Sequence, residues 1–556
     1  MRVFFACPLT SYMKAQEGGQ GSRLLAELVG FLERIEAAVL GAGHELFLAA
    51  RVEEFGAKVR HAALCTPFDM LEMQRADCLV AFPDKSYGVH VELGWASSMD
   101  KPIIVLRNEA EPDLKSPLVA GLDTVSDCQF VDVPPTLLTN VPAQEALCAR
   151  LVELLSRVQP KPELRPRYAF LSTSFGFGPV SKAVTIAREL RERIPHAELH
   201  FFGSRIDYDF AAKSRVFDRI FKVDVDDRES LEQLVPQFSV YAGVFSALNL
   251  DILPLWKPSL PALYLVDSLA WMWAQPPAGL DRVAGYFIQD YLVPPERLAE
   301  YRQRAPVHLV PPIQATGFRK NGVAKPRGPQ LLVNFSGCAT PFKNDDLLET
   351  YARVLMEAIL AEGRERFESI VFCSNEALAR RLAPALEGVH MARVGHFPHD
   401  EFLQLLAQSE RVLTSPGITT TVEALALGVP LCFLPPQNYS QALLGERNRK
   451  LLGDAPTMAL SRFGPDFQVE PNMEEGAGVA LVASHLRRVL QLHQPELREM
   501  VRGLLNTPRE HVLEKLRTNI SQPWQDSGQK VIVDHVLRAA QGAVAPAAGR
   551  DSTHEA

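Results

Sequence analysis

Residues Ala81–Leu106, AFPDKSYGVHVELGWASSMDKPIIVL, decide the fold of the first part of the chain. The apolar run Cys78–Phe82 predicts a buried parallel strand, and Val89–Ser98 predicts a helix that follows a glycine turn. Glu92 is then expected in the first helical turn, near the carboxyl edge of the sheet, where α/β proteins bind ligands. A carboxylate there can attack an anomeric carbon and form a glycosyl-enzyme ester. An isolated glutamate at this place would more often simply stabilise a helix amino terminus.

The residues around Glu92 resemble a block of the nucleoside 2-deoxyribosyltransferase superfamily. Within that superfamily they are most similar to the nucleoside 5′-monophosphate N-glycosidases, and among these to the CMP hydrolases of peptidyl-nucleoside antibiotic pathways of the mildiomycin and blasticidin type. The resemblance covers roughly residues 1–155. It includes FLAARVEEFGAK at 47–58 and the helix that carries Asp69 and Glu72.

This resemblance implies a role for each matching residue. Glu92 would be the nucleophile and Asp69 its acid/base partner. Ser86 and Gly88 would hold the 5′-phosphate. Ser116 matches a position that in relatives reaches the phosphate of a neighbouring subunit, which implies a homodimer through this domain.

The loop after the first expected strand departs from the family pattern. Relatives often carry an arginine there that contacts the phosphate or base, whereas this chain has Thr10. Lys14, Arg23 or Arg51 could supply the missing cation, and the sequence leaves open which of them does. Base preference and phosphate dependence are therefore less well determined than the nucleophile.

Length and composition define the class of protein. The chain has 556 residues, which predicts two to four domains, and 47% hydrophobic with 22% charged residues is typical of a globular protein. The net charge of −8, with no basic run, argues against nucleic acid as a partner. Eight scattered cysteines without a CxxC pair indicate reduced thiols and a cytoplasmic protein. We expect no signal peptide, no membrane span and no metal.

Proline-rich stretches divide the chain. We expect a nucleotide N-glycosidase-like domain over residues 1–158, a linker over 159–167, and then two successive α/β lobes. The lobes are expected over 168–325 and 326–541, with a disordered tail over 542–556. The predicted fold class is α/β, with a flavodoxin-like or Rossmann-like parallel-sheet domain followed by two Rossmann-like lobes.

A second informative stretch is Arg411–Gln441, RVLTSPGITTTVEALALGVPLCFLPPQNYSQ. A strand is expected to end at Thr414, and a helix then opens at the three threonines and stops at Gly428. The amides and hydroxyls at that helix amino terminus predict a phosphate site. Glu423 could accept hydrogen bonds from a ribose diol, and the amide side chains beyond the next strand suit sugar hydroxyls. Taken alone, each of these features would fit an ordinary strand, turn and helix.

The joint spacing resembles the donor half of GT-B glycosyltransferases, especially the branch that contains the peptidoglycan N-acetylglucosaminyltransferase. The resemblance implies a UDP-sugar as co-substrate, no other cofactor, and a set of donor-binding residues: Gly417, Thr419, Thr420, Thr421, Glu423, Gln437, Asn438 and Gln441. Asn334–Gly337 resembles a second loop on the phosphate side.

The other lobe carries a weaker glycine loop, with Gly176 and Gly178, that resembles the acceptor loop of the same fold. Many relatives place a catalytic histidine in this loop, and this chain has none there. Asp267 and Asp290 follow expected strands, and both are interpreted as structural caps rather than as bases.

Other polar and aromatic residues have simpler interpretations. Trp271 and Trp273 are interpreted as packing residues. Three histidines are isolated and lack the spacing of metal ligands: His196, His200 and His399. A glucuronyl donor would need a cation, but the available residues are typical surface charges: Arg319, Lys320 and Lys343.

Three functional hypotheses remain open. The first is a bifunctional enzyme that hydrolyses CMP and then transfers a sugar to the free base, as CMP hydrolase and cytosylglucuronic acid synthase do in succession. In the second, the first domain is catalytically inactive and senses a nucleotide. This hypothesis is favoured by Thr10, which replaces the expected arginine. The third keeps the hydrolase and gives the transferase an unrelated acceptor such as a lipid or glycan. The absence of an apolar or basic membrane-facing segment weakens the third hypothesis.

Overall fold

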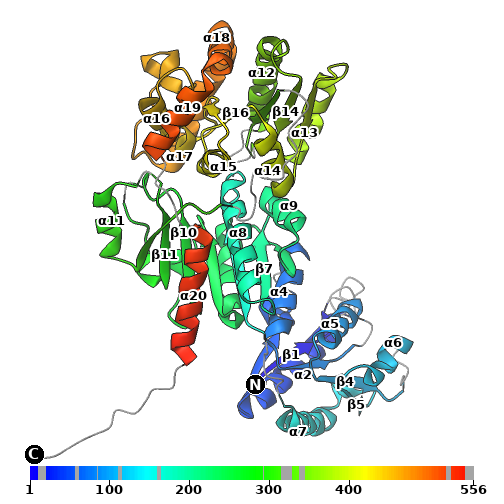
Figure 1. The fold of residues 1–556 in the computed structure, drawn as a ribbon. Coiled ribbons are helices and arrows are strands. Elements are labelled where there is room, and N and C mark those ends of the chain that lie inside the picture. Colours follow the sequence, from blue (N-terminus) through cyan, green and yellow to red (C-terminus); the bar gives the residue numbers. More distant parts are fainter. Residues whose placement is uncertain are drawn as a thin grey trace, which may run out of the picture. The chain divides into compact units, whose positions relative to one another are not determined.

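The computed structural model divides into two compact units, Met1–Arg165 and Pro166–Ala556 (Figure 1). The boundary falls inside the stretch that the sequence predicts as a linker. The structure describes residues 1–9, 21–56, 62–83, 86–110, 116–159, 165–273, 275–291, 293–314, 329–336, 338, 345–520 and 527–544. Several residues considered above lie outside these ranges: Thr10, Lys14, Arg319, Lys320, Gly337, Lys343 and most of the expected tail.

The first unit is a five-stranded parallel sheet with the strand order β2-β1-β3-β4-β5. Its strands are β1 (Arg2–Ala6), β2 (Glu45–Leu48), β3 (Cys78–Ala81), β4 (Ile103–Asn108) and β5 (Cys128–Val133). Alternate side chains of β1 enter separate cores, because successive residues of a strand face opposite sides of a sheet. The flavodoxin-like order leaves a switch point between β1 and β3, where such sheets bind ligands.

Helices cover both faces of this sheet. Helices α2 (Gly21–Gly41) and α7 (Val141–Arg157) pack on one face. Helices α4 (Ala62–Arg75), α5 (Tyr87–Ser98) and α6 (Pro117–Ala120) pack on the other.

The second unit opens with a seven-stranded parallel sheet, here called the acceptor lobe, in the order β12-β11-β10-β9-β6-β7-β8. The strands are β6 (Arg167–Ser172), β7 (Glu198–Gly203), β8 (Arg219–Lys222), β9 (Gly243–Ala247), β10 (Ala262–Asp267), β11 (Gly285–Gln289) and β12 (Val307–Val310). The helices of this lobe are α8 (Gly178–Arg193), α9 (Arg205–Ser214), α10 (Arg228–Leu234) and α11 (Pro295–Arg302). Its switch point lies between β6 and β9.

The remaining sheet, here called the donor lobe, has five parallel strands in the order β15-β14-β13-β16-β17. They are β13 (Gln330–Asn334), β14 (Ser369–Cys373), β15 (Ala392–Gly395), β16 (Arg411–Thr414) and β17 (Leu431–Phe433). Its helices are α12 (Asp345–Gly363), α13 (Glu376–Leu382), α14 (His399–Gln408), α15 (Ile418–Leu427), α16 (Tyr439–Leu452), α17 (Glu475–Leu492), α18 (Gln494–Asn506) and α19 (Arg509–Ile520). This order is that of a Rossmann sheet, with a switch point between β13 and β16.

The last helix, α20 (Gly528–Val544), returns to the acceptor lobe and packs beside α8 (Figure 1). Its buried residues Ile532, Val533 and Val536 belong to the acceptor-lobe core. The sequence placed residues up to 541 in the donor lobe, and by packing this helix is part of the other lobe. Two Rossmann-like lobes with a carboxyl-terminal helix that crosses back form a GT-B arrangement, so the predicted fold class is confirmed.

Two helices begin earlier than their apolar pattern suggests. Helix α5 starts at Tyr87, because Ser86 caps it by accepting a hydrogen bond from the Val89 amide at 3.4 Å. Glu92 therefore lies in the second turn rather than the first. Glu423 also lies in the second turn of its helix, since α15 starts at Ile418.

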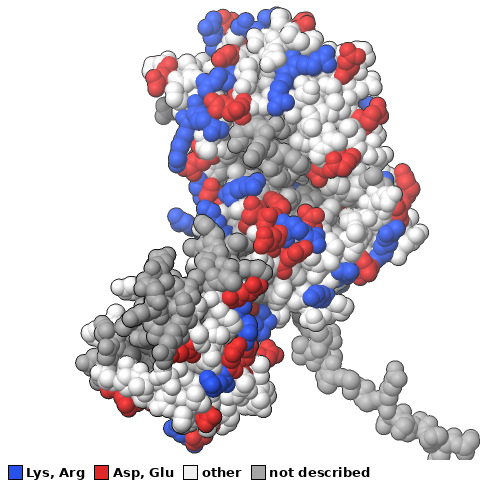
Figure 2. Space-filling view, turned by 180° about the vertical axis from the view of Figure 1, so that it is seen from behind, with Lys and Arg blue, Asp and Glu red and all other residues white. Residues whose placement is uncertain are grey.

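Within the described residues, no helix is long and apolar enough to cross a membrane, and no group of three or more acidic, histidine or cysteine side chains could hold a metal ion. The eight cysteines are free thiols. On the face drawn in Figure 2, basic and acidic side chains are interspersed among the described residues.

Candidate functional site

Two carboxylates stand on neighbouring helices beside the switch point of the first unit. Glu92 stands on α5, which follows β3, and Asp69 stands on the neighbouring helix α4. Burial raises the pKa of Glu92 well above its ordinary value, and the charge of Asp69 raises it further. Cys7, just after β1, lies close enough that Glu92 adds to the burial that raises the pKa of its thiol to about 12. The loop after β1 and the helix after β3 thus converge on Glu92.

The expected phosphate ligands lie at the start of the same helix. Ser86 is the N-cap of α5, and Gly88 is exposed in its first turn. The first-turn amides of a helix have no partner within it, so this end of α5 can receive an anion. Ser116 occupies the N-cap position of α6 on the same face of the sheet, and its hydroxyl makes no capping bond.

A cavity of about 570 Å³ lies between the acceptor and donor lobes. It is lined by residues that follow β6 and β9 in one lobe and β13 and β16 in the other, so both switch points open into it. This volume is within the range of small-molecule sites. Most of the predicted donor and acceptor-loop residues line it: Gly176, Gly178, Gly417, Thr419, Thr420, Glu423, Gln437, Asn438 and Gln441.

Thr421 is the predicted donor residue that is absent from this lining. Its side chain is buried, and its hydroxyl donates to the carbonyl oxygen of Gly417 at 2.6 Å. Thr421 thus stabilises the first turn of α15 and presents nothing to the cavity. Its neighbour Thr420 does line the cavity and accepts a hydrogen bond from the Asn334 amide at 3.1 Å.

The amino terminus of α15 faces the cavity without a capping side chain. Gly417 is its N-cap and has no side chain to offer the first-turn amides. Gly428 ends the helix in the left-handed region, with φ of 62°, where glycine is favoured. The uncapped amides and the hydroxyl of Thr419 are suited to phosphate oxygens.

The amide residues after β17 form one connected loop. Gln437 donates from its side chain to the carbonyl oxygen of Phe335 at 2.8 Å and to the hydroxyl of Ser415 at 2.7 Å. Its backbone amide donates to the Gln441 side chain at 2.9 Å. Asn438 caps α16 by accepting from the amide of Gln441 at 3.0 Å. These bonds fix the loop against β13 and β16, at the cavity edge.

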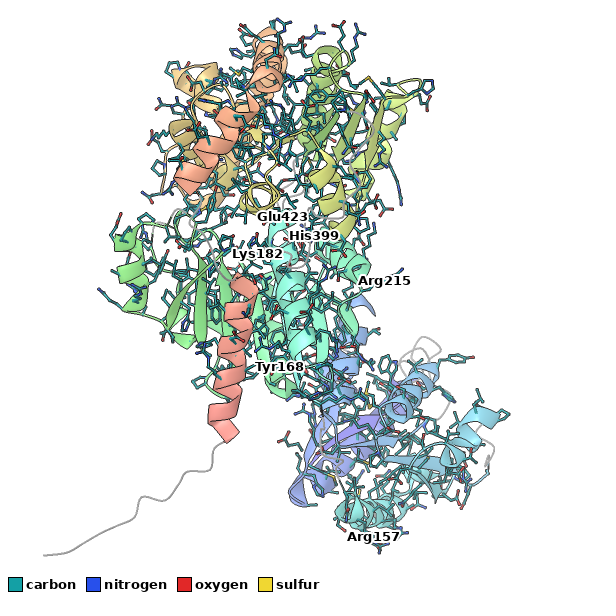
Figure 3. The ribbon with its side chains drawn as sticks, viewed as in Figure 1. Arg157, Tyr168, Lys182, Arg215, His399 and Glu423 are labelled. Atoms are coloured by element: carbon teal, nitrogen blue, oxygen red, sulfur yellow. The ribbon has the colours of Figure 1, made fainter. Side chains whose placement is uncertain are left out.

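Glu423 is paired with His399, which the sequence analysis took for an isolated histidine. The Nε2 atom of His399 lies 2.7 Å from Oε1 of Glu423, and both side chains are largely buried (Figure 3). Burial lowers the pKa of His399, but Glu423 raises it by more, so the pKa lies above its ordinary value. His399 is the first residue of α14, at the carboxyl edge of the donor sheet. This position after a strand is the feature of the sequence that could have indicated a site residue.

Lys182 is a second residue of the cavity lining to which the sequence alone gave no role. It stands in the second turn of α8, lines the cavity, and points toward α15 (Figure 3). Its ammonium donates to the carbonyl oxygen of Gly178 at 3.1 Å and to the hydroxyl of Thr419 in the donor lobe at 3.3 Å.

The aspartates of the acceptor lobe divide into structural and cavity-facing groups. Asp267 is buried and accepts from the Tyr286 hydroxyl at 2.6 Å and the Trp273 indole at 2.9 Å, in agreement with a structural role. Asp290 does not line the cavity. Asp226 does line it, accepts from the backbone amide of Ser174 at 2.9 Å, and has a pKa raised by burial.

The comparisons with known proteins give structural matches only. No protein-family model matches the chain, and no curated protein matches it by sequence. A CMP N-glycosidase of Clostridium botulinum, BcmB, matches 28% of this chain and 99% of its own length at 26% identity, with a TM-score of 0.20. A ugt transferase of Siraitia grosvenorii in complex with UDP matches 67% of this chain and 100% of its own length at 12% identity, with a TM-score of 0.37. Os79 of O. sativa in complex with UDP matches 66% of this chain and 99% of its own length at 12% identity, with a TM-score of 0.40.

Proposed function

We propose that this chain is a bifunctional enzyme that releases a base from a nucleoside 5′-monophosphate and then attaches a sugar to that base. The first unit would hydrolyse CMP to cytosine and ribose 5-phosphate. The cleft of the second unit would transfer a sugar, with glucuronic acid as the candidate, from a UDP-sugar to cytosine. The observation that carries the proposal is that the switch points of all three sheets are occupied by residues with the chemistry for these two reactions.

In the first reaction, Glu92 would attack the anomeric carbon of the ribose while the bond to the base breaks. Asp69 would act as the acid/base partner that protonates the departing base and later activates water. Burial and the neighbouring carboxylate disfavour the charge on Glu92. Positive charge that develops on the ribose would favour the ionised form, so Glu92 is suited to stabilise that transition state. Ser86 and Gly88 would hold the phosphate at the start of α5.

In the second reaction, the donor would lie along α15. The phosphates would bind at its uncapped amino terminus, and Glu423 would accept hydrogen bonds from the ribose hydroxyls. His399 holds one oxygen of this carboxylate, which leaves the other for the ribose. Asp226, whose raised pKa suits a general base, would take the proton of the acceptor from the opposite lobe.

Two assays test this proposal directly. Ribose 5-phosphate release from CMP should be seen with the wild-type protein and should fall by several orders of magnitude with Glu92→Gln, which keeps the size of the side chain but removes the nucleophile. Titration calorimetry should show UDP binding, unchanged by Glu92→Gln. A protein that bound CMP without cleaving it would instead support a nucleotide-sensing first unit.

A further inference from the structure

Lys182 is a buried cation without an anionic partner in the part of the chain that the structure describes. Its side chain is 2% exposed. Two of its three ammonium protons are donated to neutral oxygens, those of Gly178 and Thr419. It forms no ion pair with any described residue. Taking a charge out of water is costly unless an opposite charge compensates for it.

The carboxylates that act on Lys182 from a distance are bound by other groups. Glu423, on α15, is held by His399 at 2.7 Å. Asp267, at the end of β10, is held by the Tyr286 hydroxyl and the Trp273 indole. Neither can neutralise the ammonium by direct contact in this arrangement. The position is therefore suited to an anion that comes from solution.

The surroundings of the ammonium indicate which anion this is. Thr419 is the second residue of α15, so the ammonium lies at the amino terminus of a ten-residue helix whose N-cap, Gly417, has no side chain. Free helix amides from the donor lobe and a buried ammonium from the acceptor lobe, side by side in one cavity, form a site for phosphate oxygens. Gly178 borders this site, since a Cβ atom there would lie in ordinary contact with Nζ of Lys182 at 3.6 Å and with Oγ1 of Thr419 at 3.9 Å.

We propose that Lys182 is a catalytic residue that binds the diphosphate of the nucleotide-sugar donor from the acceptor lobe, opposite the helix that binds it from the donor lobe. This inference rests on the proposed transferase function and adds the group that stabilises the leaving group. The acceptor nitrogen forms the new bond to the anomeric carbon and gives its proton to a base. The bond between the anomeric carbon and the diphosphate oxygen breaks, and its electron pair stays on that oxygen, where the ammonium offsets the charge.

The test compares ligands that differ only in their phosphates. Lys182→Met removes the charge and keeps an unbranched apolar stem. Titration calorimetry should show a UDP Kd at least about tenfold higher, as for a lost hydrogen bond to a charged group, and an unchanged affinity for uridine. UMP should be affected less than UDP. Lys182→Arg retains the charge and should recover part of the UDP affinity.

Lys213→Met is the matched control. Lys213 also bridges the lobes, through an ion pair with Glu376 at 2.6 Å, but it is exposed and lies outside the cavity lining. Its removal should leave the UDP affinity unchanged. Thermal unfolding adds a second readout. Lys182→Met should not lower the Tm of the ligand-free protein, because it replaces an uncompensated buried charge by an apolar group.

Each contrary outcome has a distinct meaning. Wild-type protein that did not bind UDP would contradict the transferase function itself. Equal UDP affinity in wild type and Lys182→Met would overturn only the role of Lys182. Equal weakening of UDP and uridine, with a lower Tm, would show a structural lysine. Unchanged UDP affinity with lost turnover would make Lys182 a base and would also overturn the inference.

A measurement on the wild-type protein needs no substitution. Burial lowers the pKa of Lys182 to about 8, against the opposing effects of Glu423 and Asp267. A bound diphosphate should raise this pKa, so UDP binding at mildly alkaline pH should take up a proton. Calorimetry in buffers of different ionisation enthalpy measures that uptake. Uridine also covers His399 and Glu423 but lacks phosphate, so it is the control and should take up less. Equal uptake by both ligands would contradict the inference.

Discussion

At the scale of single residues, Glu92, the proposed nucleophile, has a raised pKa. Burial and Asp69 both disfavour its charged form. Since attack needs the ionised carboxylate, cleavage of CMP should rise with pH through this raised pKa, and the acid limb of kcat/KM should lie above the range of an ordinary glutamate. Asp69→Asn removes the like charge and should move that limb to lower pH while it slows the reaction. A pH–rate profile with an unmoved limb would remove Asp69 from the site.

Glu423 offers a second test at this scale. Its carboxylate is held on one side by His399 and is proposed to accept the ribose diol on the other. Glu423→Ala should weaken UDP binding by roughly 1–3 kcal/mol, the cost of a lost hydrogen bond to a charged group, or about tenfold to hundredfold in Kd. UMP and uridine share the ribose, so calorimetry should show the same loss for all three ligands. His399→Gln keeps a hydrogen-bond donor for Glu423 and should weaken UDP binding less than Glu423→Ala does. Full UDP affinity in Glu423→Ala would refute the donor site.

At the scale of elements, α20 fastens the end of the chain to the acceptor lobe. The Gln529 side chain donates to the carbonyl oxygen of Gln314 at 2.7 Å. A Cβ atom on Gly528 would lie 2.1 Å from the carbonyl oxygen of Pro311, so only glycine fits where the helix begins. Ile532, on α20, is fully buried in the acceptor-lobe core.

Ile532→Ala should therefore lower the free energy of unfolding of the second unit by roughly 2–5 kcal/mol, the usual effect of truncating a buried isoleucine. Denaturant unfolding followed by intrinsic fluorescence measures this change. Arg538→Ala, an exposed position on the same helix, is the control and should change it little. Equal stabilities for both variants would mean that α20 does not belong to the acceptor-lobe core.

The elements also show what a sequence can predict. Apolar runs located the start of β3, at Cys78, and the end of β16, at Thr414, to the residue, since buried parallel strands are continuously hydrophobic. The start of α5 was misplaced because the capping hydroxyl of Ser86, rather than the apolar period, sets it. The pairs that complete the cleft were not predictable from local patterns. His399 and Glu423 are 24 residues apart, and Lys182 and Thr419 are 237 residues apart.

At the scale of the whole molecule, the first unit exposes four large apolar side chains, those of Tyr87, Val91, Leu118 and Val125. These side chains are 93%, 51%, 86% and 77% exposed. Tyr87 and Val91 lie on α5 and Leu118 lies on α6, and both helices pack on one face of the sheet. Ser116 is at the start of α6, on the same face. Large apolar side chains exposed on one face favour an interaction site there. We propose that they form part of the homodimer contact that the position of Ser116 implies.

Leu118→Asp should then convert a dimer into a monomer on light scattering, because it would place a charge in an apolar contact. Cleavage of CMP should fall with it, since Ser116 would no longer reach the phosphate of the neighbouring subunit. Leu492, which is 69% exposed in the second unit, supplies the control: Leu492→Asp should leave both properties unchanged. A monomeric wild-type protein with full cleavage activity would contradict the shared site.

We propose that one chain performs both reactions in succession, and a single incubation can test this. The purified protein is mixed with CMP and UDP-glucuronate, together with other UDP-sugars in parallel, and the products are followed by mass spectrometry. The expected products are ribose 5-phosphate, UDP and a glycosylated cytosine. Glu92→Gln should form that product only when cytosine is added, and Glu423→Ala should accumulate free cytosine. If cytosine were released but no glycosylated base formed with any UDP-sugar tried, the proposal of a bifunctional enzyme would be wrong.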